Sequence, residues 1–138
     1  MSDSIRTRTA PEPVGAYPHA RRVDKLLFLS GVGSRRAEDN SVPGNVYDGE
    51  GRVIDHDIEA QCRQVFANVR AVLEASGARW EDLVDVTVFL TDMERDFKAY
   101  NALYKEYFAG VDCCRTTLGI DALPTAIHIE LKCVAALK

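Results

Sequence analysis

The chain has 138 residues, of which 46% are hydrophobic and 28% are charged. This length fits one domain, and the composition provides apolar side chains for a core as well as a mixed charged surface. The formal net charge of -4 argues against a nucleic acid partner, because binding to phosphates requires a basic face. Residues 1–13 contain neither the apolar run of a signal peptide nor a stretch that could span a bilayer. We therefore expect one domain over residues 1–138, in a cytoplasmic protein with no membrane partner.

The first third of the chain carries weak strand signals and one long polar segment. Residues 5–9 alternate weakly, and LLFLSG at 26–31 is a continuous apolar run, which predicts a central strand that is covered on both faces. Residues 33–55 are rich in Gly, Pro, Asn and Asp, and DGEG within them is suited to the turn of a hairpin. A connection of this length is uncommon unless it forms a lid or a binding loop, so this segment is a functional candidate.

The remaining chain alternates helices and strands. Residues 57–76 place apolar side chains on one face of a helix, with acidic residues at its start and Gly77 after its last turn. Residues 84–91 alternate with the period of a strand, and an amphipathic helix follows over about 96–109. Two more strands are predicted over 115–120 and 126–137. This order predicts an α+β fold with both helices on one face of the sheet, and the other face then requires a partner layer. We infer a homo-oligomer.

Familiar cofactor and metal motifs are missing from the sequence. SGVGSRR (30–36) fails the G-x-G-x-x-G pattern at its third glycine, and no helix is predicted after it. His19, His56 and His128 are far apart in the sequence and lack the spacing of metal ligands, so we interpret them as surface or structural residues. Four cysteines, Cys62, Cys113, Cys114 and Cys133, form no C-x-x-C motif, which indicates reduced thiols.

Two charged residues on the predicted strands leave alternatives open. Arg115 is suited either to an ion pair with Asp112 or Glu130 or to binding a carboxylate through its planar guanidinium. Glu130 is either a solvated strand residue or a general acid and base in a crevice. Tyr17, Ser30 and Asn101, taken alone, have the character of loop, strand-end and helix-surface residues.

Several stretches together resemble the RidA (YjgF) family of enamine and imine deaminases. They are VGAYPHARR with LFLSG, the helix and strand DIEAQCRQVFANVRAVLEASGARWEDLVDVTVFLTDM, FKAYNALYKEYF, and the tail CRTTLGIDALPTAIHIELKCVAAL. They occur in the order that the family has and cover nearly the whole chain. The resemblance implies a homotrimer of chorismate-mutase-like α+β subunits, with sites in clefts between adjacent subunits and with no metal or organic cofactor.

The resemblance also implies roles for individual residues. Arg115 is expected to bind a substrate carboxylate, and Glu130 is expected to hold the water or exchange protons with the imine. Tyr17, Ser30, Gly31 and Asn101 match positions that line the family's pocket. Thr117 stands where many members have cysteine. That difference excludes thiol chemistry at this position, whereas a hydroxyl can still hold water.

Within the family, AYPHARR and SGVGSRRAEDNSVPG are most similar to the 2-aminomuconate deaminases. Such an enzyme releases ammonia from a dicarboxylate, so the second carboxylate needs a second cation. Arg35 or Arg36 is suited to that role, although a solvated basic pair explains them equally well. Three other functions are weighed against this one: a general deaminase of 2-aminoacrylate-type enamines, a trimer that binds small carboxylates without catalysis, and RNA cleavage, which the acidic balance disfavours.

Overall fold

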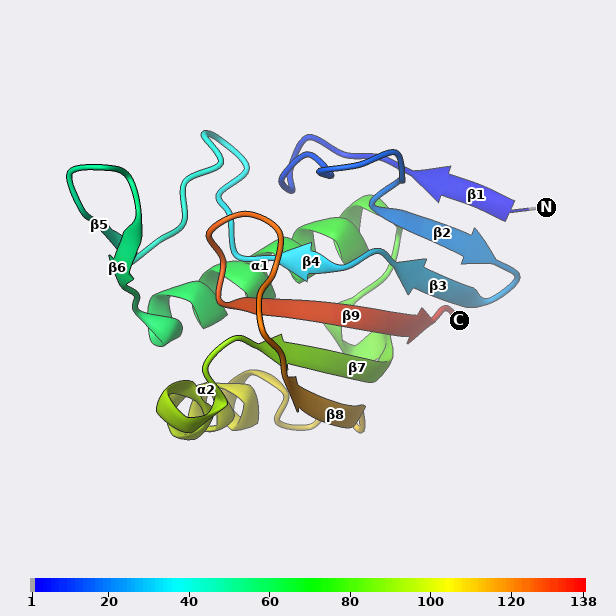
Figure 1. Ribbon diagram of the computed structural model, residues 1–138. Coiled ribbons are helices and arrows are strands. Elements are labelled where there is room, and N and C mark those ends of the chain that lie inside the picture. Colours follow the sequence, from blue (N-terminus) through cyan, green and yellow to red (C-terminus); the bar gives the residue numbers. More distant parts are fainter. Residues whose placement is uncertain (1) are drawn as a thin grey trace.

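The computed structural model describes residues 2–138 and contains one mixed sheet with two helices on the same face (Figure 1). The predicted α+β architecture is therefore confirmed. The helices are α1 (Ile58–Ala75) and α2 (Met93–Tyr107), and a short 3-10 turn spans Trp80–Asp82. The strands are β1 (Ser2–Ile5), β2 (Ala20–Val23), β3 (Leu26–Leu29), β4 (Val32–Gly33), β5 (Val46–Tyr47), β6 (Val53–Asp55), β7 (Leu83–Leu90), β8 (Cys114–Gly119) and β9 (Ile129–Ala136).

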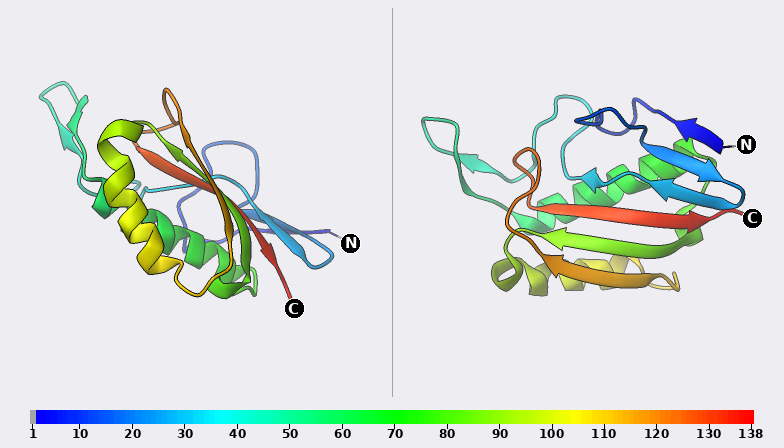
Figure 2. Two further views of the ribbon diagram at one scale, coloured as in Figure 1. Left: turned by 90° about the horizontal axis from the view of Figure 1, so that it is seen from below. Right: turned by 45° about the vertical axis from the view of Figure 1, so that its right-hand side comes forward.

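The main sheet has the strand order β1-β2-β3-β9-β7-β8, and the short β4 also pairs with β9. All pairs in it are antiparallel except β7 with β8, which α2 connects. Consecutive parallel strands require a long crossover of this kind, because a tight turn can join only antiparallel strands. Strand β9 therefore lies between β3 and β7, and β8 forms one edge of the sheet. Both helices cover the same face, as the left view of Figure 2 shows.

Helix α1 forms where its apolar period and its end signals agree. The Asp57 side chain accepts a hydrogen bond from the Ala60 amide, and Gly77 has a φ of 75° just beyond the last turn. The predicted apolar positions are all buried against the sheet or α2, namely Ile58, Cys62, Val65, Phe66, Val69, Val72 and Leu73. The helix ends one residue inside the predicted range at each end. Helix α2 begins at Met93, earlier than predicted, because Asp92 caps it by accepting from the Arg95 amide.

Two strands depart from the alternation read from the sequence. In β7, Val86, Val88 and Leu90 are buried as predicted, but Val84 is 39% exposed. A bulge between Leu83 and Asp85 shifts the register there, so Leu83 is buried in its place. The prediction that strand 26–31 is covered on both faces is wrong for the single chain. Leu27 and Leu29 are fully buried, whereas the side chains of Leu26 and Phe28 on the other face remain exposed.

Several large apolar side chains are exposed to solvent on the face of the sheet opposite the helices. Phe28 is 40% exposed, and Val23, Leu26 and Leu118 are similarly exposed. Pairing of Val23 with Leu26 and of Phe28 with Val134 puts the first three side chains on one face. Leu118 reaches the same face because it is paired with Phe89, which is paired with Glu130. Exposure of several large apolar groups together is typical of an interaction surface. This arrangement agrees with the inferred homo-oligomer, and the trimer stays a prediction.

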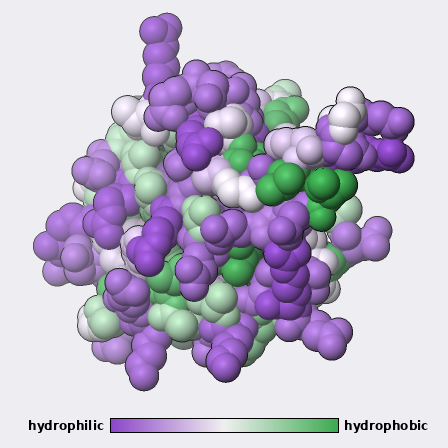
Figure 3. Space-filling model, turned by 90° about the vertical axis from the view of Figure 1, so that its left-hand side faces the viewer, coloured by the Kyte–Doolittle hydropathy of each residue, from purple (hydrophilic) through white to green (hydrophobic). Residues whose placement is uncertain are grey.

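The segment 33–55 contains the predicted hairpin. Strands β5 and β6 pair with each other in a separate two-stranded sheet and project from the body of the molecule (Figures 1 and 2). Figure 3 faces this end of the molecule, where hydrophilic side chains cover most of the surface and small apolar clusters lie between them. Ile54 in β6 is 63% exposed. Within residues 2–138, neither helix has the length and apolar character of a membrane span.

Candidate active site

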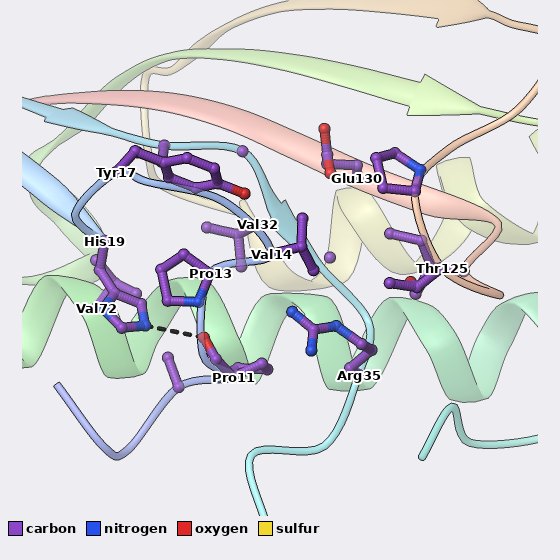
Figure 4. Close-up of a pocket in the computed structure, with 16 residues that line it drawn as sticks. Pro11, Pro13, Val14, Tyr17, His19, Val32, Arg35, Val72, Thr125 and Glu130 are labelled. Carbon is purple, nitrogen blue, oxygen red and sulfur yellow. Dashed lines mark hydrogen bonds between the residues drawn. The ribbon is translucent and has the colours of Figure 1, made fainter. Parts of the chain in front are cut away.

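A cavity of about 180 Å³ opens where β3 gives way to β4, between β9 and the segment 10–19. Its lining contains five residues that the sequence singled out, which are Tyr17, Ser30, Gly31, Arg35 and Glu130. The other lining residues are mostly apolar and include Pro11, Pro13, Val14, Val32 and Ile127 (Figure 4). A concave apolar site with a few polar groups is the usual form of a small-molecule pocket.

Glu130 enters the cavity from β9, on the face that points away from the helices (Figure 4). Its strand neighbours Ile129 and Leu131 are fully buried on the helix face, so the period of a strand directs Glu130 the other way. Burial raises the pKa of the Glu130 carboxyl above its ordinary value. Gly31 lies directly against this carboxyl, because a Cβ at Gly31 would be 2.7 Å from Oε2. The missing side chain at Gly31 is what leaves room for the acid.

The segment 10–18 forms one wall of the cavity, and His19 holds it in place. The Thr7 amide donates to His19 Nδ1 at 3.3 Å, so Nε2 carries the proton and donates to the Pro11 carbonyl at 2.8 Å (Figure 4). Ser30 ties the same wall to β3, since its hydroxyl donates to the Pro18 carbonyl at 2.7 Å. His19 is structural, as predicted, but it also lines the cavity. Tyr17 extends along the wall with an exposed ring.

The two arginines after β4 have different surroundings. Arg35 lines the cavity, and its guanidinium donates to the Asn40 side chain and to the Glu12 carbonyl, both at 2.8 Å. Arg36 does not line it, and its guanidinium donates to the Ser41 hydroxyl at 2.8 Å. Of the two candidates for a second cationic anchor, the structure therefore places only Arg35 at the cavity.

Arg115 lies in a second, open hollow, together with Asn101 and Lys105. Its guanidinium donates to the Asn101 side chain at 2.8 Å and lies 4.5 Å from the centre of the Tyr104 ring. Thr117, two residues further along β8, shares a 2.9 Å hydrogen bond with the Tyr100 hydroxyl. The ion pairs with Asp112 or Glu130 that the sequence left open are not formed in residues 2–138.

The two predicted catalytic residues face opposite sides of the sheet. Arg115 is paired in register with Val86, whose side chain is buried on the helix face, and its guanidinium lies on the rings of α2. Glu130 is paired with Phe89 and faces away from the helices. A single chain therefore does not bring Arg115 and Glu130 to one substrate. It carries two half-sites, the cavity with Glu130 and the hollow with Arg115.

A thiol lies beside Arg115 in the hollow. Cys113 lines it next to Tyr104, and burial raises the pKa of this thiol to about 11. Cys62 and Cys133 lie in the core, where burial also raises the pKa of each thiol. All four cysteines are free, as predicted.

The remaining histidines lie together, although their sequence positions gave no sign of it. The rings of His56 and His128 stack with centres 3.8 Å apart, and His56 Nε2 is 2.8 Å from the buried Asp96 carboxylate. They border a separate open cavity with Arg95 and Thr91. Burial lowers the pKa of His128, and across residues 2–138 no group of three or more possible ligands is arranged to hold a metal ion.

Sequence reasoning missed two buried amides on α1, Gln61 and Asn68. Gln61 accepts from the Ser34 hydroxyl at 2.9 Å and from the His128 amide at 2.8 Å. Asn68 donates to the carbonyls of Gly33 and Arg35 at 2.9 and 2.7 Å. Gln61 and Asn68 are seven residues apart, so they lie on the same edge of the apolar stripe of α1. Polar side chains at the edge of a buried stripe usually form hydrogen bonds, and this spacing is the signal that could have revealed them.

Comparison with known proteins identifies the family. The sequence model described as endoribonuclease L-PSP matches residues 7–137. The chain therefore belongs to the L-PSP family, also named RidA, YjgF or RutC.

Two relatives and one solved structure illustrate the similarity to other RidA proteins. A RutC family protein of Pyrococcus horikoshii is 35% identical over 135 residues, which cover 98% of each chain. The 2-iminobutanoate/2-iminopropanoate deaminase of Dermatophagoides farinae is 34% identical over 135 residues, covering 97% of this chain and 95% of the relative. The crystal structure of YyfA, a Rid family protein of Yersinia pestis, superposes with a TM-score of 0.86 at 28% identity, covering 99% of this chain and all of that one.

Proposed function

We propose that this RidA protein hydrolyses an enamine or imine that carries a carboxylate, and releases ammonia and a keto acid. The observation that carries the proposal is the Glu130 carboxyl, half-buried at an apolar cavity, with its pKa raised and with Gly31 leaving space in front of it. A carboxyl with a raised pKa holds its proton more readily than a solvated one and is suited to exchange it with a substrate. A relative that is 34% identical bears the name of an imine deaminase.

The reaction needs proton transfers and water. A proton added to the carbon of the enamine gives the iminium, and water then adds to the carbon that bears nitrogen. The resulting carbinolamine loses ammonia and becomes the ketone, so the net change is enamine plus water to ketone plus ammonia. Glu130 is assigned the proton transfers, which typically accelerate a reaction by about 10²–10⁴-fold.

Arg115 is assigned the substrate carboxylate, and it has to come from a neighbouring subunit. A guanidinium binds a carboxylate through two parallel charge-assisted bonds and fixes the reacting carbon beside the water. Because Arg115 and Glu130 face opposite sides of the sheet in one chain, we assign each site to the Arg115 hollow of one copy and the Glu130 cavity of the next. Closure of this arrangement in a ring is compatible with the homotrimer that the family resemblance implies.

The substrate that we favour is a dicarboxylate, 2-aminomuconate. Arg35 supports this choice because it places a second cation at the Glu130 cavity. The alternative is a general deaminase of small monocarboxylate imines, which the name of the Dermatophagoides relative favours. The two functions differ in the rate of ammonia release from a dicarboxylate enamine relative to 2-iminobutanoate. The family description also names an endoribonuclease, and the net charge of -4 is unfavourable for that activity.

A subunit-mixing experiment tests the proposal. Arg115→Ala and Glu130→Gln are purified separately, and each is expected to keep its fold and only a small residual deaminase activity. After they are unfolded and refolded together in equal amounts, a cleft is intact only when Arg115 and Glu130 come from different parents. Random mixing makes about a quarter of the clefts intact, so about a quarter of the wild-type activity should return. Full activity of either parent, or no recovery in trimers shown to be mixed, would contradict the proposal.

A further inference from the structure

Arg35 is held from behind by a buried amide. Asn68 is 3% exposed, and both hydrogens of its amide are used on the carbonyls of Gly33 and Arg35. Gln64 donates to the Asn68 oxygen at 3.0 Å. These three bonds fix which way the amide points, because a flipped amide would set its oxygen against two carbonyls. The backbone that carries Arg35 is thereby fastened to α1.

The guanidinium of Arg35 is held from the front by neutral groups. Asn40 accepts one bond through its side-chain oxygen and Glu12 accepts one through its main-chain carbonyl. Asn40 has a φ of 63°, a left-handed conformation that asparagine adopts more readily than most residues. Asn40 therefore has two roles at this turn: its backbone adopts the left-handed conformation, and its side chain accepts a hydrogen bond from the Arg35 guanidinium.

Arg35 keeps a full charge that residues 2–138 do not balance. It forms no ion pair in the described part of the chain, and its two recorded side-chain bonds leave three of the five guanidinium hydrogens available. The residue is only partly exposed at the cavity, where a fixed cation attracts an anion more strongly than in water. Arg35 and Glu130 lie on different walls of the cavity (Figure 4).

We propose that Asn40 and Asn68 are positioning residues that keep Arg35 as an unpaired cation for the far carboxylate of a dianionic substrate. This inference rests on the proposed function, since it names the substrate class of the same site. Neutral holders are essential to it. A carboxylate at position 40 would form an ion pair with the Arg35 guanidinium and compete with the substrate for its charge. Asn68 acts on the main-chain carbonyl of Arg35 and only fixes the backbone that carries the cation.

The test compares two stable keto acids, 2-oxoadipate and 2-oxobutanoate, which differ by the second carboxylate and one methylene. Their affinities for the assembled protein are measured by calorimetry. Wild type should bind 2-oxoadipate more tightly, and Arg35→Gln should abolish that preference. Asn40→Asp is isosteric and tolerates the left-handed backbone, so it should lower the affinity for 2-oxoadipate by about tenfold or more. Its affinity for 2-oxobutanoate should stay within about twofold, which a general loss of structure would not allow.

Two further variants separate positioning from folding. Asn40→Gly keeps the left-handed turn without the side-chain acceptor, and it should weaken 2-oxoadipate binding by about threefold to tenfold. Asn68→Ser should reduce the preference as well, and if it does not fold, the two Asn40 variants decide the question. Equal losses for both keto acids in the Asn40 variants, or an unchanged preference in Arg35→Gln, would overturn the inference. A wild type that deaminates 2-iminobutanoate but shows no preference would overturn only the inference, whereas a wild type without deaminase activity would overturn the proposed function.

Discussion

Gly31→Ala tests whether the position of the Glu130 carboxyl controls the reaction. An added Cβ would lie 2.7 Å from Glu130 Oε2, whereas ordinary contacts begin at 3.4 Å, so the carboxyl has to move by about 0.7 Å. The substitution keeps the main-chain amide of residue 31 and adds no charge. The atom that must move is Glu130 Oε2, at the end of a flexible side chain. We therefore expect a fall in kcat of about 10- to 100-fold, because a displacement near 1 Å can cost that much.

The assay measures ammonia release from 2-iminobutanoate at saturating substrate, together with the melting temperature. Gly49→Ala is the matched control, since a Cβ there would meet nothing within 4 Å, and it should behave as wild type. The double variant with Glu130→Gln locates the effect. If Gly31→Ala acts through Glu130, the double variant is no slower than Glu130→Gln alone. Additive losses, or a normal kcat in Gly31→Ala, would refute this reasoning.

Three other outcomes are expected. Because burial raises the folded-state pKa of Glu130, the folded protein loses stability as pH rises from the ordinary carboxyl pKa through the raised one. Glu130→Gln should therefore melt higher than wild type at about pH 8 and no higher at about pH 4, and thermal melts that show no gain at pH 8 would contradict it. Arg115→Lys keeps the charge but not the planar fork, so KM should rise by about tenfold while Asn101→Ala has a smaller effect; an unchanged KM would argue against carboxylate binding by Arg115. His19→Gln can keep a donor and an acceptor, whereas His19→Leu cannot, so only the leucine variant should speed hydrogen exchange at the Thr7 amide, and fast exchange in both variants would show that the ring itself is needed.

Periodicity was sufficient to predict the elements that pack against the core. The apolar stripe of α1 and the alternation of β9 were both correct, because each buries one face against the same interior. Strand β2 was missed, since its sequence ARRV has arginines at two central positions and only Ala20 is buried. The bulge at Leu83 and Asp85 was also beyond prediction, because register depends on the partner strand.

The residues proposed for the candidate site came from the resemblance, whereas their arrangement became visible only in the structure. Resemblance supplied Arg115 and Glu130, yet their faces depend on the pairing of β8 and β9 with β7, which alternation within one strand does not define. The distinction between Arg35 and Arg36 likewise depends on the turn that Asn40 closes. Asn68 was missed because its amide donates to the main-chain carbonyls of Gly33 and Arg35, which are distant in the sequence.

The thiol beside Arg115 has a chemical consequence. Burial raises the pKa of the Cys113 thiol to about 11, so the thiol is predominantly protonated at neutral pH. Peroxides and alkylating agents react with the thiolate rather than with the protonated form. Cys113 lines the same hollow as Arg115, so the sulfur beside the proposed carboxylate anchor is held mainly in its less reactive, protonated form. Burial of Cys113 therefore lowers the reactivity of the thiol in this half of the proposed site.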